Sequence, residues 1–253
     1  MTTDAIKKLK GKSAIVTGAA QGMGFAIADM LAENGVKVAV CDIKGENACA
    51  AAEKIRAKGN VAFGMEVNVT DEKEVAGMVD RTVEKYGCVD ILVNNAGILR
   101  PTKIEDISKK EWNLVLNVNL NGVFLCSKAV LPFMRKNHFG RIINMSSSAG
   151  RSVSTLGGAH YTASKAGVLG LTRAMAKEVS QYGITVNAVC PGLIDTEMVR
   201  RDCPAEKIKY YESIFPIPRL GTPQEVAQLV MFLCMDSYIT GASIDINGGD
   251  LMM

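Results

Sequence analysis

Several common signatures are missing from this sequence, and each absence narrows what the protein can be. The first ten residues lack the apolar stretch of a secretory signal, and no uncharged apolar run is long enough to span a bilayer. Lys and Arg number 29 against 26 Asp and Glu, and aromatic residues make up only 6% of the chain. A net charge of +3 without a basic cluster predicts no nucleic-acid partner and no membrane partner.

Metal and disulfide signatures are missing as well. The chain has seven Cys, an odd and scattered set without any C-x-x-C, and only two His. This pattern argues against a disulfide framework and against a structural zinc site. We therefore expect a cytoplasmic protein with reduced thiols and no bound metal.

A regular alternation of short apolar runs and helical periodicity is present along the 253 residues. The apolar runs predict seven strands, over 13–17, 36–41, 61–67, 89–93, 141–145, 184–189 and 243–246. We predict an α/β fold: a single doubly wound Rossmann-type domain over 1–253, with a seven-stranded parallel sheet and helices on both faces. The irregular stretch 193–220, which holds three of the seven prolines, is predicted to form a small helical lid over the site.

A glycine-rich loop, T-G-A-A-Q-G-M-G over residues 17–24, joins the first predicted strand to the first helix. Glycines at 18, 22 and 24 allow a tight turn and a close approach to a phosphate, which the helix N-terminus attracts. The spacing differs from the commoner G-x-G-x-x-G, so the strand–loop–helix context supports the interpretation more than the motif does. We predict a dinucleotide site that includes Gly18, Gln21, Gly22, Met23 and Gly24.

Asp42 closes the second predicted strand, where an acidic residue accepts hydrogen bonds from the adenine ribose. A carboxylate there repels a 2′-phosphate, so the expected cofactor is NAD, preferred over NADP. Two observations favour other interpretations. A strand-end Asp also caps turns, and Lys44 is a nearby cation that tolerates a phosphate.

Polar residues follow the third and fourth predicted strands as well. Ligands of open parallel sheets bind beyond the carboxyl ends of the strands. We therefore add to the predicted cofactor site the residues that follow these strands: Asn68, Val69, Asn95, Ala96 and Gly97.

Tyr161 and Lys165 in Y-T-A-S-K lie four residues apart on one face of a predicted helix. A neighbouring ammonium lowers the pKa of a tyrosine, which makes the phenol a usable general acid and base. Ser147 follows the fifth strand and is the candidate for holding a substrate oxygen, while Ser146 and Ser148 are expected to be solvated or to cap a helix. Asn119 lies inside an apolar helical pattern, which predicts a buried hydrogen-bonding role.

In this order, the motifs at 17–24, 94–97, 161–165 and 191–196, together with Asn119 and Ser147, resemble the short-chain dehydrogenase/reductase family. The resemblance implies that Tyr161 is the general acid/base and that Lys165 lowers its pKa and binds the nicotinamide ribose. It also implies that Ser147 orients the substrate and that Asn119 anchors a proton-relay water. In the P-G-L-I-D-T segment it implies cofactor contacts from Pro191, Gly192, Ile194 and Thr196. A homotetramer without a metal is further implied.

The subgroup that this chain resembles contains 3-oxoacyl carrier-protein reductases, sugar and polyol dehydrogenases, and hydroxysteroid dehydrogenases. Carrier-protein reductases of the family usually favour NADPH. Because Asp42 predicts NAD, the first hypothesis is an NAD-dependent oxidoreductase that acts on a secondary alcohol or ketone. The alternative is a 3-oxoacyl carrier-protein or coenzyme A reductase that uses NAD(P)H. A non-catalytic dinucleotide sensor is the third possibility.

Two further features leave alternatives open. His160 precedes Tyr161 and either touches the substrate or belongs to the start of the helix. Arg200 and Arg201 either attract an anionic substrate or lie on a solvated helix face.

Overall fold

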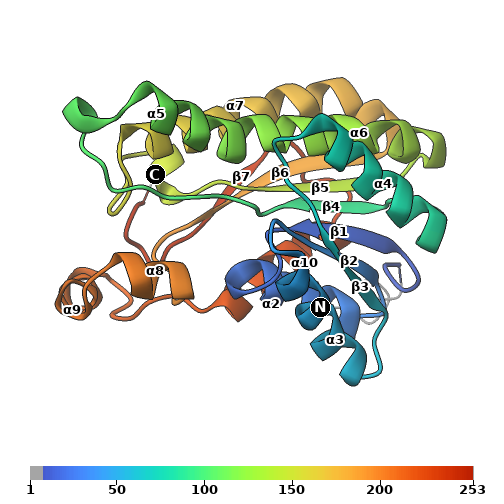
Figure 1. Ribbon diagram of the computed structural model, residues 1–253, viewed down its shortest axis with the longest axis horizontal. Coiled ribbons are helices and arrows are strands. Elements are labelled where there is room, and N and C mark those ends of the chain that lie inside the picture. The colour runs from blue at the N-terminus through green and yellow to red at the C-terminus, as the bar shows by residue number, and fades with distance from the viewer. Residues whose placement is uncertain (1–7, 253) are drawn as a thin grey trace.

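Seven parallel strands form one sheet in the computed structural model, which describes residues 8–252 (Figure 1). Segment 1–7, which includes most of the stretch searched for a signal, lies outside the described residues. The strands are β1 (Ser13–Thr17), β2 (Lys37–Asp42), β3 (Ala62–Glu66), β4 (Ile91–Asn94), β5 (Gly140–Met145), β6 (Ile184–Pro191) and β7 (Ser243–Ile246). Their order is β3-β2-β1-β4-β5-β6-β7, which confirms the predicted doubly wound fold.

The chain changes direction across this sheet between β1 and β4. Strands β1 to β3 run outward to one edge, and β4 returns to pair with the other side of β1, with Ala14 opposite Ile91. Ligands of such sheets bind in the crevice at this reversal, outside the carboxyl ends of the strands.

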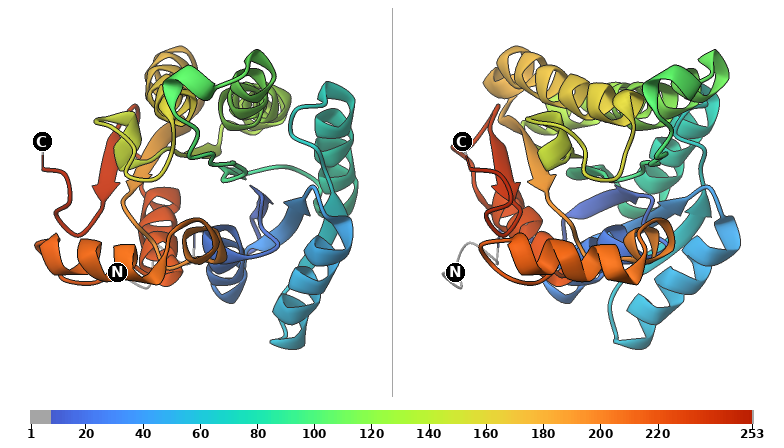
Figure 2. Two further views of the ribbon diagram at one scale, coloured as in Figure 1. Left: turned by 60° about the vertical axis from the view of Figure 1, so that its left-hand side comes forward. Right: turned by 90° about the vertical axis from the view of Figure 1, so that its left-hand side faces the viewer.

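Helices cover both faces, as Figure 2 shows. One face carries α2 (Gly22–Glu33), α3 (Gly45–Ala57) and α10 (Pro223–Met235), whose small and aliphatic residues share one apolar cluster with β1 and β2. The other face carries α4 (Glu72–Tyr86), α5 (Lys109–Leu116), α6 (Gly122–Asn137) and α7 (Ala159–Val179). The two large apolar clusters therefore hold the sheet between the helix layers, and the carboxyl edge of the sheet is left to the loops.

The two ends of α4 illustrate how local sequence sets these bounds. Asp71 is the cap of α4, because its carboxylate accepts from the backbone N–H groups of Lys73 and Glu74. Gly87 ends the same helix with φ of 89°, a conformation that glycine adopts without strain. Local residues therefore set both the start and the end of this helix.

The stretch Lys109–Asn137 is one continuous helical rod with a π-helical turn, η2 (Asn117–Asn121), between α5 and α6. By length and composition alone, with a mean hydropathy of 1.5, it is the one stretch of residues 8–252 that could cross a membrane. The α6 part packs Val123, Cys126 and Val130 into the core beside β4 and β5. This packing is that of a core helix in a sheet protein.

The predicted lid region 193–220 contains α8 (Glu197–Asp202) and α9 (Ala205–Ile214), which project beyond the sheet (Figure 1). An isolated bridge between Ile194 and Gly221 closes the base of this excursion. That this segment moves as a lid stays a prediction.

Candidate active site

The carboxyl edge of the sheet gathers the predicted site residues from loops far apart in the chain. The cofactor candidates follow β1, β2, β3, β4 and β6, and the reaction candidates lie after β5 and in η2 and α7. Parallel strands place their carboxyl ends at one edge, so the topology alone brings these segments together.

The glycine loop is held by the loop after β4. Thr17 Oγ1 accepts from the backbone N–H groups of Asn95 and Ala96, each at 3.1 Å. The amide of Asn95 donates back to the carbonyl oxygens of Thr17 and Gly18, at 3.0 and 2.8 Å. Gly18 is required here, because its φ is +62° and a Cβ would lie 2.8 Å from Ala96 Cα. Asn95 therefore supports the glycine loop.

The first turn of α2 fits a dinucleotide phosphate. Its N-cap residue Gln21 makes no capping hydrogen bond with its side chain, and no acidic residue lies in the first turn. The first N–H groups at this end therefore have no capping side chain from Gln21, and they carry the positive end of the helix dipole. Gly22, with φ of +57°, faces Thr196 across the crevice, so the loop and the lid base flank one space.

Asp42 makes hydrogen bonds within the protein. Oδ2 accepts from the N–H of Ala20 at 3.2 Å, and Oδ1 accepts from the N–H of Lys44 at 3.1 Å. These are the contacts of a turn-capping carboxylate, and they tie the end of β2 to the glycine loop. Lys44 itself is exposed at the start of α3.

The other cofactor candidates lie along the same crevice. Asn68 Oδ1 accepts from the N–H and hydroxyl of Thr70, which leaves its NH2 group without a partner among the described residues. Val69 is 8% exposed and packs against Gly122. Gly192 is fixed to β7 by a hydrogen bond from its N–H to the carbonyl of Ile246, and Thr196 caps α8 through Val199.

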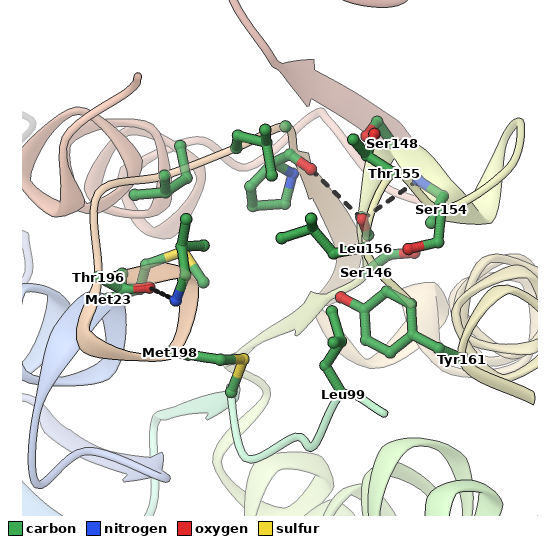
Figure 3. A pocket seen from close by; sticks show the side chains of 17 residues that line it. Met23, Leu99, Ser146, Ser148, Ser154, Thr155, Leu156, Tyr161, Thr196 and Met198 are labelled. Atoms are coloured by element: carbon green, nitrogen blue, oxygen red, sulfur yellow. Dashed lines mark hydrogen bonds between the residues drawn. The ribbon is translucent and has the colours of Figure 1, made fainter. Parts of the chain in front are cut away.

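Tyr161 and Ser147 line a pocket, and Lys165 lies beside the Tyr161 ring. In Figure 3 the Tyr161 side chain points into this pocket, opposite Met198. The Ser147 hydroxyl bonds the Tyr161 hydroxyl, and it also lies 3.5 Å from the Pro191 carbonyl. Lys165 Nζ donates to the Met145 carbonyl at 2.7 Å and lies 5.7 Å from the centre of the Tyr161 ring.

Burial dominates the ionisation of this pair. It raises the pKa of Tyr161 above its usual value, while the hydrogen bond with Ser147 acts in the opposite direction. It lowers the pKa of Lys165 to about 8. That Lys165 lowers the pKa of Tyr161 stays a prediction, because the rise caused by burial is a net effect.

Asn119 is fully buried in the π-helical turn, as its position in an apolar pattern predicts. Its Oδ1 accepts from the N–H of Ile98 at 2.8 Å, and its Nδ2 donates to the Ile98 carbonyl at 2.9 Å and to Ser164 Oγ at 3.1 Å. The amide thus fixes the loop after β4 to α7. Gly97 in that loop packs directly on Asn119 and on Lys165 Nζ. A role of Asn119 in anchoring a relay water stays a prediction.

Several alternatives from the sequence are resolved by contacts. Ser146 is buried, not solvated, and its hydroxyl donates to the Lys165 carbonyl at 2.8 Å. His160 is fully buried and bonds Glu111 and the Tyr161 N–H, so it belongs to the helix start. Arg200 pairs with Asp195 through two contacts of 2.6 and 2.7 Å.

The pocket spans about 610 Å³, part of it open solvent, and none of the residues between 8 and 252 that line it is charged. Its walls include residues that sequence reasoning missed: Leu99, Ser154, Thr155, Leu156, Leu193, Met198 and Val199. These aliphatic and hydroxyl residues belong to no recognisable motif. The sequence alone does not distinguish a loop residue that lines a pocket from one that does not. Within residues 8–252, no three His, Cys, Asp or Glu residues gather to bind a metal.

Comparisons with known proteins agree with this arrangement. Residues 18–250 match the family model described as enoyl-(acyl carrier protein) reductase. A 3-oxoacyl-[acyl-carrier-protein] reductase FabG of Staphylococcus aureus is 44% identical over 246 residues, which cover 95% of this chain and 98% of that protein. A 3-oxoacyl-[acyl-carrier-protein] reductase of Synechocystis is 42% identical over 248 residues, with 96% of this chain and 98% of that protein covered.

A solved structure is also similar to nearly the whole chain. A short-chain type dehydrogenase/reductase from Mycobacterium marinum has a TM-score of 0.91 with this chain at 36% sequence identity. The match covers 95% of this chain and 96% of that protein.

The relatives correct the expected cofactor. Carrier-protein reductases of this kind usually favour NADPH, so relatives with that name contradict the prediction that NAD is preferred over NADP. The physical reason is the position of Asp42. Its two oxygens accept from backbone N–H groups, so an acid at the end of β2 here is explained by the turn and does not require a ribose hydroxyl.

Proposed function

The chain belongs to the short-chain dehydrogenase/reductase family, and we propose that it reduces the ketone of 3-oxoacyl thioesters with NADPH. The acyl group is carried by acyl carrier protein or by coenzyme A. The observation that carries this proposal is the full-length likeness to 3-oxoacyl-[acyl-carrier-protein] reductases at 40–44% identity. A pocket without charged side chains beside Tyr161 supports it, because the acyl part of such a substrate is uncharged.

Tyr161, Ser147 and Asn119 have different roles in the proposed reaction. The hydride for the ketone carbon would come from a reduced nicotinamide held along the crevice. Tyr161 gives its phenolic proton to the ketone oxygen as that oxygen gains negative charge. Ser147, which bonds the Tyr161 hydroxyl, donates to the same oxygen and fixes its position. Asn119 acts by holding the loop after β4 against α7.

The protonation state of Tyr161 is compatible with ketone reduction. Ketone reduction requires a protonated phenol, and alcohol oxidation requires a phenolate. Because burial raises the pKa of Tyr161, the protonated form dominates near neutral pH.

The same crevice carries the proposed coenzyme contacts. The N–H groups at the start of α2 face the pyrophosphate, and the NH2 group of Asn68 is available to the adenine. Lys165 holds the nicotinamide ribose, and Ile194 and Thr196 hold the carboxamide. The exposed Lys44 beside Asp42 supplies a cation for the 2′-phosphate of NADPH.

We further propose a cytoplasmic homotetramer, as is common in the family. Leu114 on α5 and Phe124 on α6 are 45% and 47% exposed, which supports an interface on these helices. All seven cysteines are free, which fits a reducing compartment. Light scattering of the purified protein measures the oligomeric state.

The test of function is coenzyme oxidation with acetoacetyl thioesters of coenzyme A and of acyl carrier protein. We expect turnover with NADPH in preference to NADH, and its loss in Tyr161→Phe. Secondary alcohols with both oxidised coenzymes, and an enoyl thioester, are run in parallel. Turnover of only these other substrates overturns the thioester assignment. Tight coenzyme binding without any turnover supports a sensor instead.

A further inference from the structure

The imidazole of His160 is fully buried where α7 begins, directly before the reactive Tyr161. Its Nε2 lies 2.9 Å from Glu111 Oε1 in α5. Its Nδ1 lies 2.9 Å from the backbone nitrogen of Tyr161. Both ring nitrogens are therefore used inside the protein, and neither reaches the pocket.

These contacts define the protonation of the ring. A backbone N–H only donates, so Nδ1 of His160 must accept from Tyr161 and carries no proton. The neutral ring then has its proton on Nε2, which donates to the Glu111 carboxylate. One imidazole thus connects a carboxylate on α5 to the main chain of Tyr161.

The start of α7 needs this contact because its cap residue has no side chain. Gly158 is the N-cap, and a Cβ there would overlap the carbonyl oxygen of Thr102. The N–H of Gly158 donates to the Arg100 carbonyl at 2.8 Å. The Tyr161 N–H is shared between the Gly158 carbonyl, at 3.1 Å, and the ring of His160. His160 therefore supplies the capping acceptor that Gly158 lacks.

Glu111 is itself anchored at the other end. It lies in the first turn of α5, where Ser108 Oγ accepts from its N–H at 3.1 Å. The side chain of Thr102 also bonds its carboxylate. Glu111 therefore joins α5, the loop after β4 and α7, and Leu99 of that loop lines the pocket.

We propose that His160 is a positioning residue, and that the Glu111–His160 pair sets the distance between the Tyr161 hydroxyl and the substrate oxygen. The Tyr161 backbone is held from α5 by this pair, and its hydroxyl is held from the sheet by Ser147. Proton transfer needs the phenol within hydrogen-bond reach of the ketone oxygen, so a small displacement of the helix start costs much of the rate.

The two hydrogen bonds of His160 can be tested separately. At position 160, Asn would place an amide oxygen near the position of Nδ1, and Gln would place an amide NH2 group near that of Nε2. Phe would fill the same space without making either hydrogen bond. We expect His160→Phe to lower kcat at least about tenfold while KM for thioester and for NADPH stays within about twofold. His160→Asn is expected to recover part of kcat.

Glu111 provides the reciprocal test. Glu111→Gln keeps an oxygen that accepts from Nε2 and is expected to stay close to the wild type. Glu111→Leu is expected to resemble His160→Phe. The double variant Glu111→Leu/His160→Phe is expected to be no worse than either single change, because both remove one connection.

A matched control separates positioning from stability. Asp90→Asn alters another buried polar pair at the opposite end of the sheet and is expected to lower stability with kcat per folded molecule unchanged. His160→Phe with a normal kcat and lowered stability, like this control, overturns the proposal. Equal kcat losses in His160→Phe and His160→Asn overturn it as well.

The inference rests on the proposed function only in its choice of assay. A second readout needs no substrate: the ultraviolet titration of Tyr161, taken as the difference between each protein and its Tyr161→Phe counterpart. Displacement from the Ser147 hydroxyl is expected to raise the pKa of Tyr161 in His160→Phe, and an unchanged titration contradicts the proposal. Failure of the wild type to reduce thioesters affects the proposed function and not this measurement.

Discussion

A buried charged side chain lies at each end of the sheet, and the two differ in whether an opposite charge pairs with them. At the amino end, Asp90 is 2% exposed and receives the ammonium of Lys12 at 2.9 Å and the N–H of Ser13 at 2.9 Å. Cys88 Sγ adds a third contact at 3.1 Å. At the carboxyl end, Lys165 is 5% exposed and its ammonium donates to the carbonyl of Met145. No carboxylate of the described residues lies within ion-pair distance of it.

This difference distinguishes a buried charge that stabilises the fold from a buried charge that is expected to serve the reaction. A paired and fully hydrogen-bonded charge holds elements together, as Asp90 does for β1 and β4. An ammonium without a counter-charge is costly to bury, and its pKa falls to about 8 for that reason. Groups with strongly shifted pKa values gather at functional sites, which makes the carboxyl end the candidate for the chemistry.

The strongest test of this comparison is Tyr161→Phe at the carboxyl end. Removing the phenolic proton donor is expected to lower kcat for ketone reduction by about 10²–10⁴-fold. Stability is expected to change little, since the ring still fills the same space. The measurement is kcat at saturating NADPH together with urea unfolding. A kcat within tenfold of the wild type assigns the acid role to another group.

Lys165→Met is expected to abolish activity and yet to stabilise the fold near pH 7. The fall in pKa from 10.5 to about 8 corresponds to roughly 3 kcal/mol, and the lost hydrogen bond to Met145 offsets about 1 kcal/mol. The wild type gains stability between pH 8 and pH 10.5, where the unfolded lysine binds a proton that the folded one has lost.

The stability difference between Lys165→Met and the wild type should therefore shrink as pH rises through this window. Urea unfolding of both proteins at neutral and alkaline pH measures it. A difference that is constant with pH contradicts the depressed pKa.

At the amino end, Asp90→Asn should show the converse behaviour. The amide turns one acceptor oxygen into a donor that faces Lys12 and Ser13, so the variant loses about 1–3 kcal/mol of stability. The kcat per folded molecule is expected to stay unchanged. Urea unfolding and active-site titration give the two quantities, and a selective loss of kcat would join this end to the chemistry.

The smallest effect is expected on the surface of the lid region. Arg200 is 68% exposed and its pair with Asp195 is solvated, so Arg200→Ala should cost less than about 1 kcal/mol. KM for coenzyme A thioesters, which carry phosphates, should stay within about twofold. A rise of KM by tenfold or more would instead assign Arg200 to attraction of an anionic substrate.

Much of the fold could be read from the sequence because its signals are local. Apolar runs of strand length predicted β1 and β7 with their observed bounds, and Asp71 and Gly87 delimit α4. The site candidates followed from their places after strands, since the ends of parallel strands share one edge. The preference for NAD was wrong because one residue type, Asp42, serves a turn as readily as a ribose.

Other properties depended on contacts between segments far apart in the chain. The ionisation of Tyr161 followed from burial, which the Y-x-x-x-K spacing does not contain. Glu111 and His160 are 49 residues apart in the sequence, and no pattern in either segment predicts that their side chains are in contact.

The sequence alone therefore determined the order of strands and helices along the chain and placed the candidate residues at one edge of the sheet, because periodicity and strand ends are local. The tertiary structure alone decided which side chains are desolvated, which contacts occupy Asp42 and Asn119, and what holds Tyr161 in place. Those properties arise from distances between segments, and only the packed chain sets such distances.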